Sequence, residues 1–185
     1  MKITGKKSLL WWIRYPFGIY TAGFSATSLW TLGLLATYFF TNKVNRFISL
    51  ETLQNSHHSK AYESVRFHYP YSKMVLSTEN STEGLLLAFF GLLSINFILI
   101  VVLKISIELS RDNFFTGKAV QNFKILGFGL LSFGIIHLLI DFLISSHQFD
   151  FTQPFIFIIT GLIFMLMKEI FLKGKEIQDE NDLAI

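Results

Sequence analysis

The sequence predicts an all-α membrane protein: a bundle of four transmembrane helices with a small structured loop on the outer side. Hydrophobic residues make up 51% of the 185-residue chain, and the mean hydropathy is +0.48. These residues are gathered into four long runs, which is typical of helices in lipid. Lys and Arg stand beside the runs, so the net charge of +3 reflects membrane topology better than nucleic-acid binding.

We expect the spans at residues 16–41, 84–104, 125–146 and 152–172. Each is close to or longer than the ~20 residues that cross a hydrocarbon core. The first run lacks a small-x-small cleavage site and is therefore predicted to be retained. The third contains Asp141, but its many Leu, Ile and Phe residues outweigh the roughly +3 kcal/mol of a central Asp. Pro154 suits the first turn of the fourth helix, where a missing N–H does no harm.

Basic residues predict the orientation. With the N-terminal segment, the inner loop 105–124, the tail 173–185 and the adjoining helix ends on one side, that side holds eleven Lys and Arg residues, Lys104 and Lys168 included. The outer loop 42–83 holds five. The excess predicts that both termini are cytoplasmic in a cell (inner) membrane crossed several times. Trp11, Trp12 and Tyr15 then form an aromatic anchor at the inner interface.

The outer loop is predicted to begin as a continuation of the first helix, over Lys43 to Asn55. Farther on, Val65, Phe67 and Tyr69 alternate with polar residues before Met74-Val75-Leu76, which predicts a short hairpin. Asn80-Ser-Thr82 has the pattern of a glycosylation sequon, but a polar loop end explains it better.

Sites for chemistry are not evident in the sequence. The chain has no cysteine, nucleophile–base pair, phosphate-binding loop or metalloprotease motif. His57, His58, His68 and His147 fall on the outer side beside Asp150, without the spacing of a metal site. We therefore predict no enzymatic activity, no cofactor and no metal.

Polar residues within the spans give the first candidate site. His137 and Asp141 are four residues apart, so they share a helix face. They are either a functional pair, as a proton relay or half of a metal site, or a histidine held by a carboxylate near the outer interface. Asn96 is a candidate for a hydrogen bond between helices. Gly18, Ala22 and Ala26 form a small-residue stripe that serves packing within the chain or a homodimer.

Charges at the inner ends of the spans form a second group: Lys104, Glu108, Lys168 and Glu169. Lys168 and Glu169 lie too far from Asp141 to pair with it, so we expect them to pair with Lys104, Glu108 or Lys124. Otherwise they form a pair that marks the membrane interface.

The cytoplasmic segments carry the third group. Thr116 is the expected N-cap of a helix leading into the third span. The last helix is predicted to break at Gly174 and to continue as an acidic tail with four acids against two bases. The candidate docking residues of this tail are Glu176, Asp179, Glu180, Asp182, Leu183 and Ile185.

Two cytoplasmic strings resemble the DUF2975 family of bacterial membrane proteins. One is Phe115-Thr-x-x-x-Val120…Phe123-Lys-Ile-Leu-Gly127, and the other is Glu169-Ile-Phe-x-x-Gly174-x-Glu-Ile-Gln-Asp-Glu-Asn-Asp-Leu-Ala-Ile185. Phe114, Ala119 and Ala184 replace the family's usual Pro, Asn and Thr. The resemblance implies four spans and frequent association with small Xre/Cro-type helix-turn-helix regulators, and it implies no known activity.

Three hypotheses for function follow. The first is a non-enzymatic membrane regulator or sensor whose acidic tail competes for the basic surface of a cytoplasmic helix-turn-helix protein, without itself touching nucleic acid. The second is a structural or stress-related membrane bundle, in which the tail is only a solvated end. The third is a small proton- or ion-coupled transporter that uses His137 and Asp141. In all three the bilayer is the principal partner.

Overall fold

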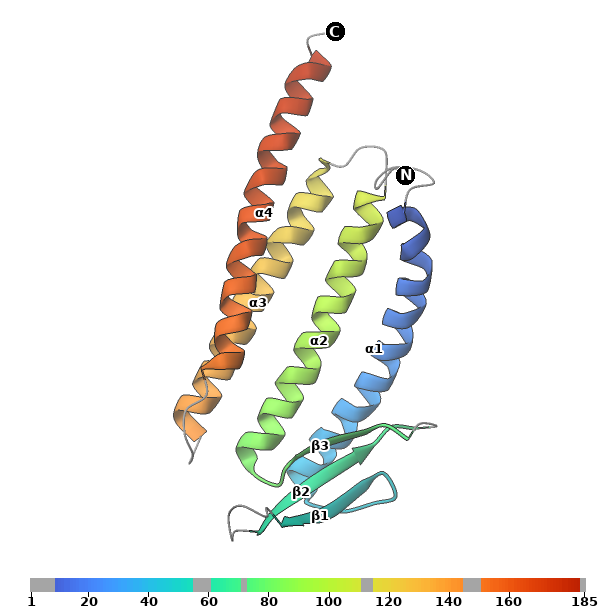
Figure 1. Ribbon diagram of the computed structural model, residues 1–185, viewed down its shortest axis with the longest axis vertical. Coiled ribbons are helices and arrows are strands. Elements are labelled where there is room, and N and C mark those ends of the chain that lie inside the picture. The colour runs from blue at the N-terminus through green and yellow to red at the C-terminus, as the bar shows by residue number, and fades with distance from the viewer. Residues whose placement is uncertain (1–8, 55–60, 71–72, 111–114, 145–150, 184–185) are drawn as a thin grey trace.

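The computed structural model describes residues 9–54, 61–70, 73–110, 115–144 and 151–183. In chain order the elements are α1 (Leu9–Thr41), β1 (Ile48–Gln54), β2 (Ala61–His68), β3 (Val75–Glu79), α2 (Thr82–Leu109), α3 (Gly117–Ile144) and α4 (Thr152–Leu183). The helices run alternately up and down, so the start of α1 and the end of α4 lie at the same end of the molecule and the sheet lies at the opposite end (Figure 1). We call these the terminal end and the sheet end.

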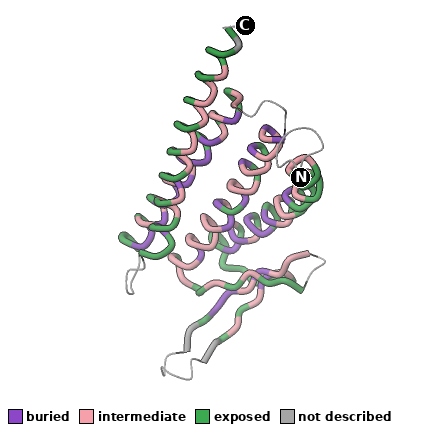
Figure 2. The backbone as a smooth tube through the Cα atoms, turned by 45° about the horizontal axis from the view of Figure 1, so that its top comes forward, coloured by how far each residue is buried: buried purple, intermediate pink, exposed green. Residues whose placement is uncertain are grey.

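The four helices stand in a row. The extensive helix contacts join α1 to α2, α2 to α3, and α3 to α4. Exposed residues follow every helix of this layer (Figure 2). The four helices expected from the sequence are present, and in the described residues they form an open layer because each helix makes its closest contacts with its neighbours in the chain.

Length and composition single out three of the helices as candidate membrane spans. These are α2, α3 and Thr152–Asn181 of α4, in which an apolar segment of 18 residues has a mean hydropathy of 2.8, 2.0 and 2.2, respectively. Helix α1 is longer than any of them, but its five threonines and two serines after Tyr15 make it less apolar. The helices also extend beyond the predicted spans: residues 105–109 are helical, not loop, and the helix expected after Thr116 begins at Gly117.

Helix α1 ends where the sequence predicted that it would continue. Asn42 takes a positive φ of 50° and its N–H donates to the Tyr38 carbonyl oxygen at 2.8 Å. Such left-handed residues terminate helices, and Asn is one of the few side chains that tolerates them. The expected helix over residues 43–55 is therefore wrong, and β1 occupies much of that segment.

The predicted hairpin is confirmed and has one more strand than expected. β2 pairs antiparallel with β3, with Phe67 opposite Leu76, and also with β1, with Ile48 opposite Phe67. The sheet buries Ile48, Val65 and Phe67 against Leu35 and Tyr38 of α1 and Leu85 of α2. This contact supplies the packing that an isolated hairpin lacks.

The sequon residues fasten the sheet to the helices. Asn80 accepts a hydrogen bond from the Tyr38 hydroxyl and donates to Glu63, both at 3.0 Å. Ser81 is the N-cap of α2 and accepts from the Gly84 N–H at 3.0 Å. These contacts give Asn80 and Ser81 a structural role.

Candidate functional site

The C-terminal helix projects beyond the rest of the layer at the terminal end (Figure 1). Helix α4 runs without interruption to Leu183, so the predicted break at Gly174 is wrong. Glu176, Asp179 and Glu180 are exposed, and Leu183 is 87% exposed. The side chain of Asp182 and the whole of Ile185 lie outside the described residues. The acidic tail is thus a helical extension of a membrane-compatible helix.

Gly174 has a different role from the one predicted. A Cβ atom at this position would overlap the ring of Phe115, which comes from the connection between α2 and α3. Gly174 therefore leaves room for an aromatic ring to lie directly on the backbone of α4. This glycine was predicted to break the helix, although a single glycine in a helix is tolerated and often marks a close contact.

A group of aromatic rings surrounds this contact. Phe171 lies 5.4 Å from Phe115 and 4.7 Å from Phe123, measured between ring centroids. Phe123 also stacks on Phe164 at 6.2 Å. We call Phe115, Phe123, Phe171 and Gly174 the aromatic junction. It fixes the base of the projecting helix to α3 and to the connection before it, and offset or edge-on pairs of this kind each add about 0.5–1.5 kcal/mol.

The aromatic junction was not predicted as a site from the sequence. Its signal was nevertheless present, because all four residues belong to the two strings that carry the family resemblance. Phe171 and Gly174 are three residues apart and so share one face of a helix. The sequence did not show that these two segments are in contact in the folded protein.

Thr116 caps α3 as predicted and also links it to α2. The Ala119 N–H donates to the Thr116 hydroxyl at 3.1 Å. That hydroxyl in turn donates to Glu108 at 3.5 Å, and the Glu108 side chain is buried at the end of α2. Ala119, at the position where the resemblance leads us to expect Asn, is fully buried by the surrounding residues.

The inner-interface charges separate into two groups. Lys104 and Glu108 line a cavity of about 360 Å³ between α2 and α3, together with Lys118, Gln121, Asn122 and two isoleucines. Lys168 instead forms an ion pair with its neighbour Glu169, and neither lines this cavity. The expected pairing of Lys168 with charges on α2 or α3 is not seen among the described contacts. The Lys168–Glu169 pair agrees with the alternative of an interface marker.

His137 and Asp141 are both buried on one face of α3, as their spacing predicted. His137 is 1% exposed and stacks on Phe157 of α4, with ring centroids 5.3 Å apart. Neither ring nitrogen has a hydrogen-bond partner in the described part of the chain. The expected hydrogen bond between the imidazole and the carboxylate is therefore absent there, and the histidine is held by packing.

The outer histidines provide little evidence for a binding site. His57, His58, His147 and Asp150 lie outside the described residues. His68 is hydrogen-bonded through Nε2 to the Ser49 hydroxyl at 3.0 Å. Among the residues that the structure describes, no group of three His, Cys, Asp or Glu side chains could hold a metal ion.

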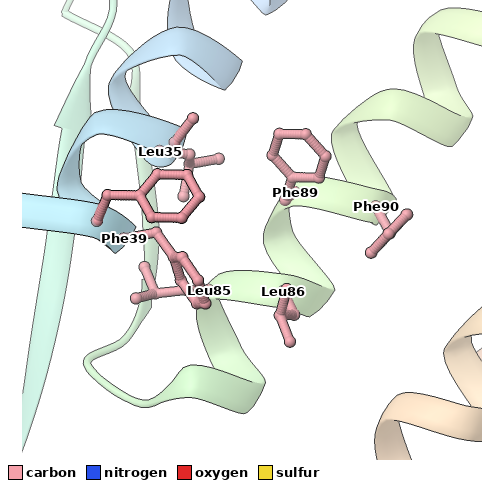
Figure 3. Close-up of a pocket in the computed structure, with 8 residues that line it drawn as sticks. Leu35, Phe39, Leu85, Leu86, Phe89 and Phe90 are labelled. Atoms are coloured by element: carbon pink, nitrogen blue, oxygen red, sulfur yellow. The ribbon is translucent and has the colours of Figure 1, made fainter.

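A second hollow lies at the sheet end, between α1 and α2 (Figure 3). It measures about 210 Å³, and its lining side chains are all apolar: Leu35, Ala36, Phe39, Phe40, Leu85, Leu86, Phe89 and Phe90. Without a polar group to orient a ligand, this hollow has none of the convergent contacts expected of a specific site.

Three helices long and apolar enough to cross a membrane indicate a helical membrane protein. It belongs to the family described as "Protein of unknown function (DUF2975)", which matches residues 12–185 and hence nearly the whole chain. No curated protein and no solved structure matches it.

Proposed function

We propose that this protein is a non-enzymatic membrane regulator that offers its C-terminal helix to a small cytoplasmic helix-turn-helix protein. If α1 also crosses the membrane, the chain has four spans and both termini lie on the cytoplasmic side of the cell membrane. The observation that carries the proposal is the projecting acidic helix whose base is held by the aromatic junction. The type of partner rests on the family resemblance.

Charge supports a basic partner. Residues 173–185 contain four acids and two bases, and Glu176, Asp179 and Glu180 are exposed on the projecting helix. Lys175 is already used in an exposed ion pair with Asp179 at 3.3 Å. A DNA-binding domain presents a basic surface to phosphates, so an acidic helix could occupy that surface in competition with DNA.

Preorganisation supports docking by this segment. A tail that is already helical loses less conformational freedom on binding than a disordered one. Ile177, 60% exposed, and Leu183 add apolar area beside the carboxylates. A preformed helix that presents acidic and apolar side chains together suits the groove or flat face of a small helical domain.

Copurification from detergent tests the docking. The full chain would be coexpressed with small helix-turn-helix proteins of its own genome and compared with the triple variant Glu176→Gln, Asp179→Asn, Glu180→Gln. Exposed charge pairs contribute about 0.2–1 kcal/mol each, so we expect a loss of affinity from a few-fold to about 100-fold. Glu79→Gln, an exposed acid of the sheet, is the matched control. Equal capture by the full chain and by a chain truncated after Lys173 would exclude the tail as docking element.

Cysteine labelling tests the topology separately. Because the chain has no cysteine, single substitutions report their own side of the membrane. With an impermeant maleimide on intact cells, we expect Val44→Cys to react and Leu183→Cys to react only after permeabilisation. Labelling of both in intact cells would contradict the proposed orientation of α4 or the span by α1.

A further inference from the structure

We propose that the cavity between the terminal ends of α2 and α3 binds the phosphate of an anionic membrane phospholipid. The cavity measures about 360 Å³, and the residues that line it belong to α2 and α3, not to the projecting helix. This inference is independent of the helix-turn-helix partner. It requires only that α2 and α3 cross the membrane, for which both are long and apolar enough.

Depth places the cavity at the level of the lipid headgroups. Helix α2 carries no charged side chain from Gly84 to Leu103, and those residues span about 30 Å, the thickness of a hydrocarbon core. Lys104 is the first charge after that segment and therefore lies at its boundary. On α3 the last charge before the apolar segment is Lys124, and Lys118 lies about 9 Å farther out along the helix.

The lining residues suit a phosphate group. Lys104 and Lys118 are exposed cations on opposite walls, and Gln121 and Asn122 add amide donors. Lysine is a common phosphate ligand in proteins and acts as a point charge. Juxtamembrane lysines are each worth roughly a factor of five in binding to an anionic membrane surface.

The buried carboxylate in the wall does not exclude an anion. Glu108 accepts a hydrogen bond from Thr116, so part of its charge is directed into the cap of α3. With two lysines and one carboxylate, the cavity keeps an excess of one positive charge. Ile107 and Ile125 complete the lining and provide apolar contact for the glycerol end of a lipid.

Native mass spectrometry of the full chain in dodecyl maltoside tests this site. Phosphatidylglycerol and phosphatidylcholine would be added separately, and inorganic phosphate would be tested as a competitor. We expect Lys104→Gln with Lys118→Gln to weaken phosphatidylglycerol retention by about 10- to 30-fold. Phosphatidylcholine should be retained weakly by every variant. Gln keeps most of the side-chain stem, and thermal unfolding would verify that the variant is folded.

Lys124→Gln is the matched control, because Lys124 is an exposed lysine of α3 that does not line the cavity. It should change phosphatidylglycerol retention less than twofold. Three outcomes would overturn the proposal. They are unchanged retention in the double variant, equal retention of both lipids by the native chain, and displacement by millimolar inorganic phosphate, which would indicate a site for a free anion.

Discussion

The α3–α4 pair and the α1–α2 pair solve the same packing problem with different residues. Between α3 and α4 the backbones meet through Gly127, Gly134 and Gly161, where a Cβ atom would lie within about 3 Å of the opposite helix. Between α1 and α2 the buried residues include hydroxyl and amide side chains: Thr21, Ser28, Thr31, Ser94 and Asn96. The first pair relies on close van der Waals contact, and the second relies partly on hydrogen bonds.

The difference has a consequence for each pair. The α3–α4 contact continues through the aromatic rings up to the base of the projecting helix, so the proposed docking element stands on the more closely packed half of the protein. The α1–α2 pair contains the apolar hollow at the sheet end and a buried Ser28 hydroxyl without a described hydrogen-bond partner. We therefore expect the α1–α2 pair to be the less stable half.

The largest effect is expected from Gly161→Val. The new Cβ atom would lie 2.9 Å from Leu131 Cγ and 3.0 Å from the Gly127 carbonyl oxygen, and a backbone atom cannot move aside as a side chain can. Overpacking of this kind costs about 1–3 kcal/mol or more. The free energy of unfolding in mixed micelles, measured by titration with SDS, would show the loss.

Gly23→Val is the control for this prediction. Gly23 lies on α1, and no described atom of another element lies within 4 Å of the position that its Cβ atom would take. The stability of this variant should stay within about 0.5 kcal/mol of the native chain, as is usual for exposed sites. An equal loss in both variants would mean that the α3–α4 contact is not the tighter one.

A smaller effect is expected across α1 and α2. The Ser25 hydroxyl donates to Asn96 Oδ1 at 2.6 Å, which confirms the hydrogen bond predicted for Asn96. A double-mutant cycle with Ser25→Ala and Asn96→Ala should give a coupling of about 0.6 kcal/mol and at most about 1.7 kcal/mol. The described hydrogen bonds of the Thr27 hydroxyl go to carbonyl groups of its own helix, so Thr27→Ala with Asn96→Ala should show no coupling.

The small-residue stripe belongs to the same comparison. Ala22 and Ala26 are exposed, so the chain does not bury them itself, and Gly18 alone approaches α2, at Leu103. Of the two alternatives for the stripe, packing within the chain accounts for Gly18 only. The homodimer stays a prediction.

The sequence predicted local features well where one segment determines them. The four helices, the hairpin of Val65 and Phe67, and the Thr116 cap all depend on periodicity or on a single capping side chain. β1 was missed because Val44, Phe47 and Ile48 also fit helical spacing. Asn42 ends the helix, and pairing with β2 then decides the conformation.

The candidate site was less predictable because it depends on contacts between distant segments. Glu176, Asp179 and Glu180 were identified from charge alone, but the helix that carries them was not. The ring of Phe115 lies against the backbone at Gly174, and this contact depends on the fold, which brings residue 115 beside α4. Hydrophobic periodicity predicts which face of a helix is apolar but not which other helix packs against that face. The arrangement of the four helices in an open layer could therefore not be predicted from the sequence.

The last prediction concerns the one unsatisfied polar side chain described in the tight half. His137 is buried against Phe157 without a described hydrogen bond, and leaving such a group unpaired costs about 1–3 kcal/mol. His137→Leu should therefore raise the free energy of unfolding, by about 1 kcal/mol after the loss of the ring contact. The matched control is His68→Leu, because His68 is hydrogen-bonded to Ser49 and should lose about 0.5–1.5 kcal/mol. Destabilisation by both leucines would mean that His137 has a polar partner, and the transporter hypothesis would then regain its intramembrane pair.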